Sequence, residues 1–106
     1  MPKISYHKLV RDRIPEIIAA DGKTCTVETL SDADYLTMLD AKLDEELAEY
    51  HKEPSVEELA DLLEVIYAVA KARGWSVDEL ERVRKEKADS RGGFEKKILL
   101  KEVQER

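Results

Sequence analysis

Two pairs of carboxylates are the residues of this sequence best suited to chemistry. Glu46 and Glu49 lie before Pro54, and Glu58 and Asp61 lie after it. Within each pair the residues are three apart, so in a helix they lie about one turn apart on neighbouring positions of the same face. Oxygen ligands without Cys or His suit hard cations such as Mg²⁺ or Mn²⁺. The types and spacing therefore suggest a divalent-cation site.

The four carboxylates meet only if the two helices fold back on each other at Pro54. A proline ends the first helix there because it lacks an N–H and disfavours helical geometry in the preceding residue. Residues equidistant from the turn then face each other, which pairs 46 with 61 and 49 with 58. Four carboxylates this close repel, so they persist only if protonated or neutralised by a cation.

A solvated, charge-rich helix surface is the simpler interpretation of the same residues. The projected position of Glu58 counts against it, because Glu58 lies within the apolar arc of its own helix, between Val65 and Val69. A di-iron bundle is excluded because it needs two Glu-x-x-His motifs, and neither His7 nor His51 follows a glutamate at that spacing.

Capping patterns predict the helices that position these residues. A serine followed three residues later by an acid occurs three times, which is typical of a helix start: Ser31 with Asp34, Ser55 with Glu58, and Ser76 with Glu79. We expect the three helices to end at Pro54, at Gly74 and near Ser90. A shorter helix, with Pro15 in its first turn, should precede Gly22, and β-branched residues from 24 to 30 favour a short strand or an extended connection.

Composition sets limits on the protein class. The 106 residues are enough for a single domain, which we expect to be an all-α bundle of four helices built on the hairpin. A net charge of −6 argues against a protein that coats a nucleic-acid polymer. No stretch approaches the roughly 18 apolar residues of a membrane span. The single Cys25 and the lack of a signal peptide favour the cytoplasm.

Charge and apolar residues are unevenly distributed along the chain. Residues 28–64 carry a net charge of −11, and the two flanks together carry +5. Apolar residues cover more than half the circumference of the helix after Pro54, which is too much for a lone hairpin to bury. We therefore expect a homo-oligomer, either a homodimer or a homotetramer.

Three motifs, taken in chain order, resemble those of a known family. They are YHKLVRDRIP near the amino terminus, EExxE at 45–49 followed by ExxD at 58–61, and RGGFEKKI near the carboxyl terminus. In this order they are similar to the motifs of the all-alpha nucleoside triphosphate pyrophosphohydrolases, the MazG-like group, to which phosphoribosyl-ATP pyrophosphohydrolases are related. The resemblance implies hydrolysis of a nucleoside triphosphate to a monophosphate and pyrophosphate, with Mg²⁺ as cofactor and Mn²⁺ as a possible substitute.

The resemblance also assigns roles to residues. It implies that Glu46, Glu49, Glu58 and Asp61 bind the metal, and that Glu45 orients or deprotonates the attacking water or is itself a ligand. Basic residues should bind the substrate phosphates, and five candidates lie near the motifs: Lys8, Arg11, Lys42, Lys87 and Arg91. Lys8 and Arg11 would share one face if the first helix began early enough. Lys42 has a second interpretation, as an ion-pair partner of Glu46 one turn away.

Two other functions remain open at this point. The substrate could be phosphoribosyl-ATP, an intermediate of histidine synthesis, with the same chemistry. Alternatively, the chain could be a non-catalytic helical dimerisation module whose acidic face binds a basic partner.

Overall fold

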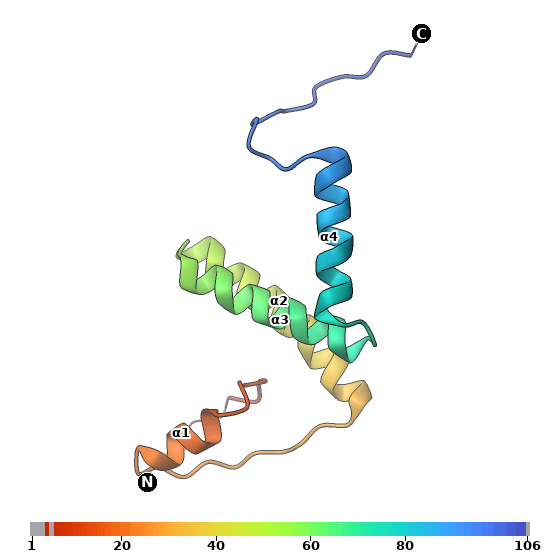
Figure 1. The fold of residues 1–106 in the computed structure, drawn as a ribbon. Helices are drawn as coiled ribbons and strands as arrows, with labels where there is room; N and C mark the ends of the chain where they lie inside the picture. Colours follow the sequence, from red (N-terminus) through yellow and green to blue (C-terminus); the bar gives the residue numbers. More distant parts are fainter. Residues whose placement is uncertain (1–3, 5, 106) are drawn as a thin grey trace. The chain divides into compact units, whose positions relative to one another are not determined.

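The fold is all-helical in the part of the chain that this computed structural model describes, which is Ile4 and residues 6–105. It contains four helices and, within those residues, no strand (Figure 1): α1 (Ile14–Ala20), α2 (Asp32–Lys52), α3 (Val56–Ala72) and α4 (Val77–Arg91). The expected fold class is therefore confirmed at this level. The chain divides into two units, Met1–Trp75 and Ser76–Arg106.

Serine caps begin α2, α3 and α4, as the capping patterns predict. In each case the serine Oγ accepts a hydrogen bond from the backbone N–H three residues on, at 3.2, 3.2 and 3.0 Å for Ser31, Ser55 and Ser76 respectively. These bonds satisfy N–H groups that have no partner within the helix. The cap at Ser55 has a further effect, because its donor is the N–H of Glu58 and it fixes the helical turn that carries this site residue.

The two long helices form the predicted hairpin. α2 ends at Lys52, two residues before Pro54, and α3 begins two residues after that proline. The two helices lie side by side in Figure 1 and pack against each other, whereas α1 packs on neither of them. The buried apolar residues of the described chain are Leu39 on α2 and Val65 and Ala70 on α3.

Glycine ends α1 and α3 in the same way. At Gly74, with φ of +94°, the Trp75 N–H donates to the Ala70 carbonyl at 2.9 Å and the Gly74 N–H donates to the Lys71 carbonyl at 3.0 Å. This is a Schellman motif, which requires a left-handed residue and so favours glycine. Gly22 does the same for α1, so both predicted glycine stops are confirmed.

The first helix begins too late in the sequence for Lys8 and Arg11 to share one of its faces. α1 begins at Ile14 with Pro15 in its first turn, so both basic residues precede it. The reason is that a proline deeper in a helix would clash with the carbonyl four residues earlier, here that of Arg11. The suggestion that these two residues share a helical face is therefore wrong.

Residues 24–30 form an extended connection and not a strand. They lie in neither a helix nor a sheet, and all but Leu30 are exposed. A strand needs a neighbouring strand to accept its backbone hydrogen bonds, and none exists in the described chain. Of the two possibilities that the β-branched residues left open, the extended connection is thus the correct one.

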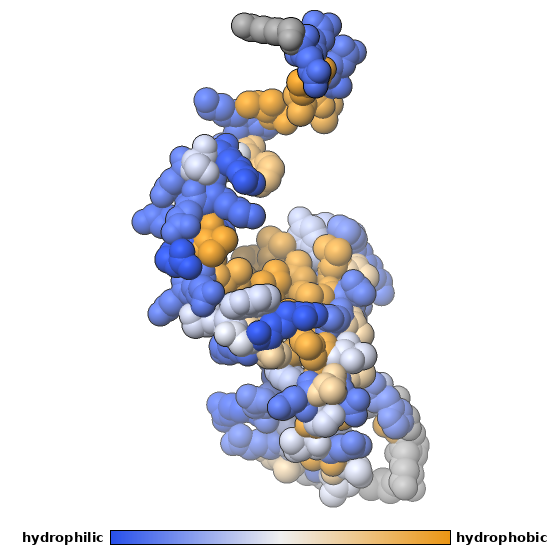
Figure 2. Space-filling view, turned by 90° about the vertical axis from the view of Figure 1, so that its right-hand side faces the viewer, coloured by the Kyte–Doolittle hydropathy of each residue, from blue (hydrophilic) through white to orange (hydrophobic). Residues whose placement is uncertain are grey.

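Many apolar side chains of both units are exposed. On the hairpin, Leu47, Leu59 and Leu63 are 43%, 48% and 44% exposed. In the second unit, Phe94 and the run 98–100, which follow the end of α4 at Arg91, are largely exposed. Figure 2 shows apolar side chains at the surface of the hairpin and of the carboxyl-terminal segment. Among the described helices, none combines the length and the apolar character that crossing a bilayer requires.

Candidate functional site

The hairpin brings three of the four predicted carboxylates together. Glu46 comes from α2, and Glu58 and Asp61 come from the first two turns of α3. One carboxylate oxygen of each lies within 4.8 Å of one oxygen of each of the others. Glu46 is only 13% exposed, so the group lies partly shielded from water where the two helices pack. Three oxygen ligands at this separation can surround one cation.

The environment of Glu58 disfavours a negative charge. Its partial burial raises the pKa of its carboxyl above the ordinary value of 4.5, and the charges of Asp61, Glu49, Glu46 and Glu53 raise this pKa further. Loss of hydration and repulsion by like charges both disfavour the ionised form. A cation bound among these carboxylates would remove this penalty.

Glu49 lies outside the three-carboxylate group. It is exposed, although its charge is close enough to raise the pKa of Glu58. Three residues advance a helix by about 300°, so Glu49 is rotated by roughly 60° from Glu46 around α2. The same rotation separates Glu58 from Asp61, which both belong to the group, so neither spacing nor matched height about the turn predicts which carboxylates come together. The structure therefore does not gather all four predicted ligands.

Lys42 pairs with the acidic residues of its own helix. Its Nζ lies 3.4 Å from Oε1 of Glu45 and 3.5 Å from Oε1 of Glu46. Its side chain is 18% exposed, which is less than that of any other cation beside the group. Lys42 therefore lies next to the carboxylates as an ion-pair partner, as its second interpretation proposed.

The basic arm before α1, residues 6–13, also reaches these carboxylates. Arg11 Nη2 lies 2.7 Å from Oδ1 of Asp61, and Lys8 Nζ lies 3.5 Å from Oε1 of Glu45. Sequence reasoning did not predict these two contacts, because it assigned both basic residues to the substrate. The separation of an acidic centre from basic flanks was the signal that could have indicated them.

The other two candidate phosphate ligands lie in the second unit. Lys87 and Arg91 are one turn apart on α4, and Arg91 is its last residue. The carbonyl of Lys87 accepts a hydrogen bond from Ser90 Oγ at 3.4 Å. Both residues are exposed.

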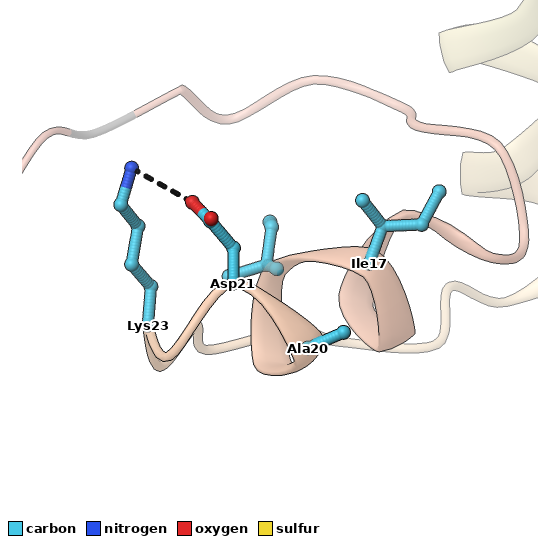
Figure 3. A pocket seen from close by; sticks show the side chains of 5 residues that line it. Ile17, Ala20, Asp21 and Lys23 are labelled. Atoms are coloured by element: carbon cyan, nitrogen blue, oxygen red, sulfur yellow. Dashed lines mark ion pairs between the residues drawn. The ribbon is translucent and has the colours of Figure 1, made fainter.

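A separate hollow lies at the end of α1 (Figure 3). It has a volume of about 420 Å³ and is lined by Ile17, Ile18, Ala20, Asp21 and Lys23. Lys23 Nζ pairs with Asp21 Oδ2 at 3.4 Å, so the two charged side chains that line the hollow already neutralise each other. None of the candidate site residues lines this hollow.

Comparison with known proteins gives one partial match. A protein of Mycolicibacterium smegmatis, described as an uncharacterized protein, is 64% identical over 42 residues. The matched stretch covers 40% of this chain and 43% of that relative, which is less than half of either. No family model matches the chain, and no solved structure matches it. The likeness shows a relative over that stretch and does not extend to a function.

Proposed function

We propose that this protein hydrolyses a nucleoside triphosphate between the α and β phosphorus atoms, giving a monophosphate and pyrophosphate. The observation that carries the proposal is the group formed by Glu46, Glu58 and Asp61, whose oxygens lie within 4.8 Å of one another across two helices. The resemblance of the sequence motifs to the MazG-like pyrophosphohydrolases supports the same reaction.

The donor set fits Mg²⁺, with Mn²⁺ as a substitute. All three groups offer carboxylate oxygen, which hard cations prefer. The raised pKa of Glu58 is a second sign of fit, because it reflects negative charge that a cation would offset. When bound, the metal would supply positive charge for the phosphate oxygens and lower the pKa of a water molecule. Glu49 lies about one turn further along α2. It would complete the set of ligands only if its side chain moved or if a water molecule bridged it to the metal.

Glu45 is the residue we assign to the attacking water. Its ion pairs with Lys8 and Lys42 both use Oε1. Oε2 is therefore the oxygen that can accept a proton from water, while the two ammonium groups hold the carboxylate in place. General bases of this kind act through direct hydrogen bonding to the proton that they remove.

Basic residues around the carboxylates would hold the triphosphate. Lys8, Arg11 and Lys42 already lie within ion-pair distance of the acidic side chains, so they stand beside the place where a metal-bound phosphate would bind. Arginine binds phosphate through two parallel N–H groups, which favours Arg11 for orienting the substrate. Lys87 and Arg91, on α4, stay predictions from the sequence.

We also propose that the active form is a homodimer or a homotetramer in which hairpins join into a bundle. The exposed Leu47, Leu59, Leu63 and Ile66 of the hairpin leave apolar surface that a second copy would cover. Helical bundles bury this kind of surface through closed, symmetric contacts.

The test is the nature of the phosphate released. With Mg²⁺ and a panel of nucleoside triphosphates, we expect pyrophosphate and no orthophosphate from at least one substrate. Asp61→Asn should lower the rate at least 100-fold, in line with the loss of a group that acts electrostatically in the transition state. Glu64→Gln is the matched control, because Glu64 is exposed on the same helix and is not part of the carboxylate group. Equal activity of wild type and Asp61→Asn would refute the proposal.

The same assay separates the alternatives. Phosphoribosyl-ATP belongs in the panel, and a rate for it well above that of every nucleoside triphosphate would identify it as the substrate. A non-catalytic dimerisation module would release no phosphate from any of them and would gain no thermal stability from Mg²⁺.

A further inference from the structure

Basic side chains of the protein itself already lie beside the three-carboxylate group. Lys42 belongs to α2, but Arg11 belongs to the arm of residues 6–13, which has no helical structure before Ile14. The contact of Arg11 with Asp61 spans 50 residues of sequence and is the shortest ion pair described. The arm is therefore held to α3 by one of the residues that we assign to the metal.

The contact between Arg11 and Asp61 is of a kind that exchanges easily. The two side chains are 59% and 43% exposed. Exposed ion pairs change an equilibrium by about fivefold or less, because water and salt screen them. A doubly charged cation bound directly by Asp61 and two further carboxylates competes well with such a contact, and it repels a guanidinium placed on the same carboxylate.

We propose that Arg11 is a displaceable counter-ion of the metal site. It neutralises Asp61 in the metal-free protein and is released from it when a divalent cation binds. The inference rests on the proposed function and adds the order in which the metal and the triphosphate bind. Arg11 becomes available to a phosphate only after the metal has bound, so the arm does not bind triphosphate unless the metal that neutralises the carboxylates is present.

The chain offers a matched control in Arg13. It lies in the same segment and carries the same charge, but its Nε pairs with Oε2 of Glu16, three residues away, at 3.3 Å. Arg11→Gln and Arg13→Gln thus remove the same charge close together in sequence. Only the first of them removes a contact with the carboxylate group.

The experiment is a calorimetric titration of the full chain with Mn²⁺ at fixed ionic strength. We expect Arg11→Gln to bind Mn²⁺ about two- to fivefold more tightly than wild type, which is the range that an exposed ion pair allows. Arg13→Gln should bind like wild type. Circular dichroism of the variants checks that their helices are retained.

A second measurement follows Arg11 itself. Because coupling between two binding events is reciprocal, Mg²⁺ should loosen the guanidinium that competes with it. Nitrogen-15 relaxation of the Arg11 Nε–H group should show greater motion with Mg²⁺ than without it, while the Arg13 Nε–H group is unchanged.

The possible failures are distinguishable. If Mn²⁺ binds all three proteins with the same affinity, the displacement of Arg11 is refuted and the metal site stands. If wild type binds no Mn²⁺, both the metal site and the displacement are refuted. If Arg11→Gln binds Mn²⁺ more weakly than wild type, Arg11 supports the metal site and does not compete with it, which also overturns the inference.

Discussion

Glu58 is a residue whose surroundings disfavour its charge. Its partial burial and four neighbouring carboxylates raise its pKa. Such a carboxyl binds more protons in the folded than in the unfolded protein, so the free energy of unfolding falls as the pH rises above the ordinary value of 4.5. In the metal-free protein, the charged form of Glu58 therefore opposes folding at neutral pH and ceases to do so when it is protonated.

Glu58→Gln should raise the melting temperature of the metal-free protein at pH 7. The amide keeps the shape of the side chain and removes the repelled charge. The gain should shrink as the pH falls through the interval above 4.5, because wild-type Glu58 then becomes protonated. Thermal unfolding in a chelator across this pH range measures the effect.

Glu57→Gln is the control for this prediction. Glu57 lies in the same first turn of α3, so its substitution loses the same interaction with the helix dipole. An equal gain in both variants would mean that repulsion within the carboxylate group is not the cause. Added Mg²⁺ should raise the melting temperature of wild type more than that of Glu58→Gln.

At the scale of the elements, the capped start of α3 links local sequence to the site. The Ser55 side chain holds the backbone N–H of Glu58, and Asp61 follows one turn later. The directions of both carboxylates thus depend on a helix start that the residues from Ser55 to Glu58 specify.

Ser55→Ala should lower the free energy of unfolding of the hairpin by about 1 kcal/mol, the usual effect of losing a side-chain cap. It should also weaken Mn²⁺ binding, because the first turn of α3 then frays and Glu58 is held less firmly. Urea unfolding and a Mn²⁺ titration measure the two effects. Ser55→Thr keeps a hydroxyl acceptor and should retain most of both properties, so an equally large loss in the threonine variant would argue against the cap as the cause.

Helix starts and stops were the most predictable features of the fold, because each depends on a few adjacent residues. Three serine caps, the break at Pro54 and two glycine stops all lie where the sequence indicated. The strand possibility for 24–30 was wrong for the opposite reason, since a strand depends on a partner elsewhere in the chain.

At the scale of the whole molecule, the hairpin buries few apolar residues for its size. Leu39, Val65 and Ala70 are buried, whereas Leu59 and Leu63 are 48% and 44% exposed on α3. Covering an exposed leucine contributes about 1.5 to 3 kcal/mol when it is complete. The exposed leucines are therefore the residues on which an assembly of hairpins would depend.

Leu63→Gln should weaken self-association by at least tenfold. In a symmetric dimer the substitution is present twice. Losing half of the burial free energy of a leucine in each copy therefore costs about 1.5 to 3 kcal/mol in total, which exceeds the roughly 1.4 kcal/mol that corresponds to tenfold. Sedimentation equilibrium over a range of concentrations measures the association. Glu64→Gln, the exposed neighbour, should leave association unchanged, and a wild-type protein that remains monomeric at high concentration would contradict the proposed assembly.

The sequence by itself determined the helical class, the position of the turn and the candidate carboxylates on either side of it, because periodicity and capping are local properties. Tertiary structure decided which of them come together. Glu49 lies outside the group, whereas packing at the hairpin brings oxygens of Glu46, Glu58 and Asp61 within 4.8 Å of one another. The contact of Arg11 with Asp61 likewise joins residues 50 apart. Spacing along a chain specifies neighbours on one helix, whereas the approach of separate segments depends on packing and charge in three dimensions.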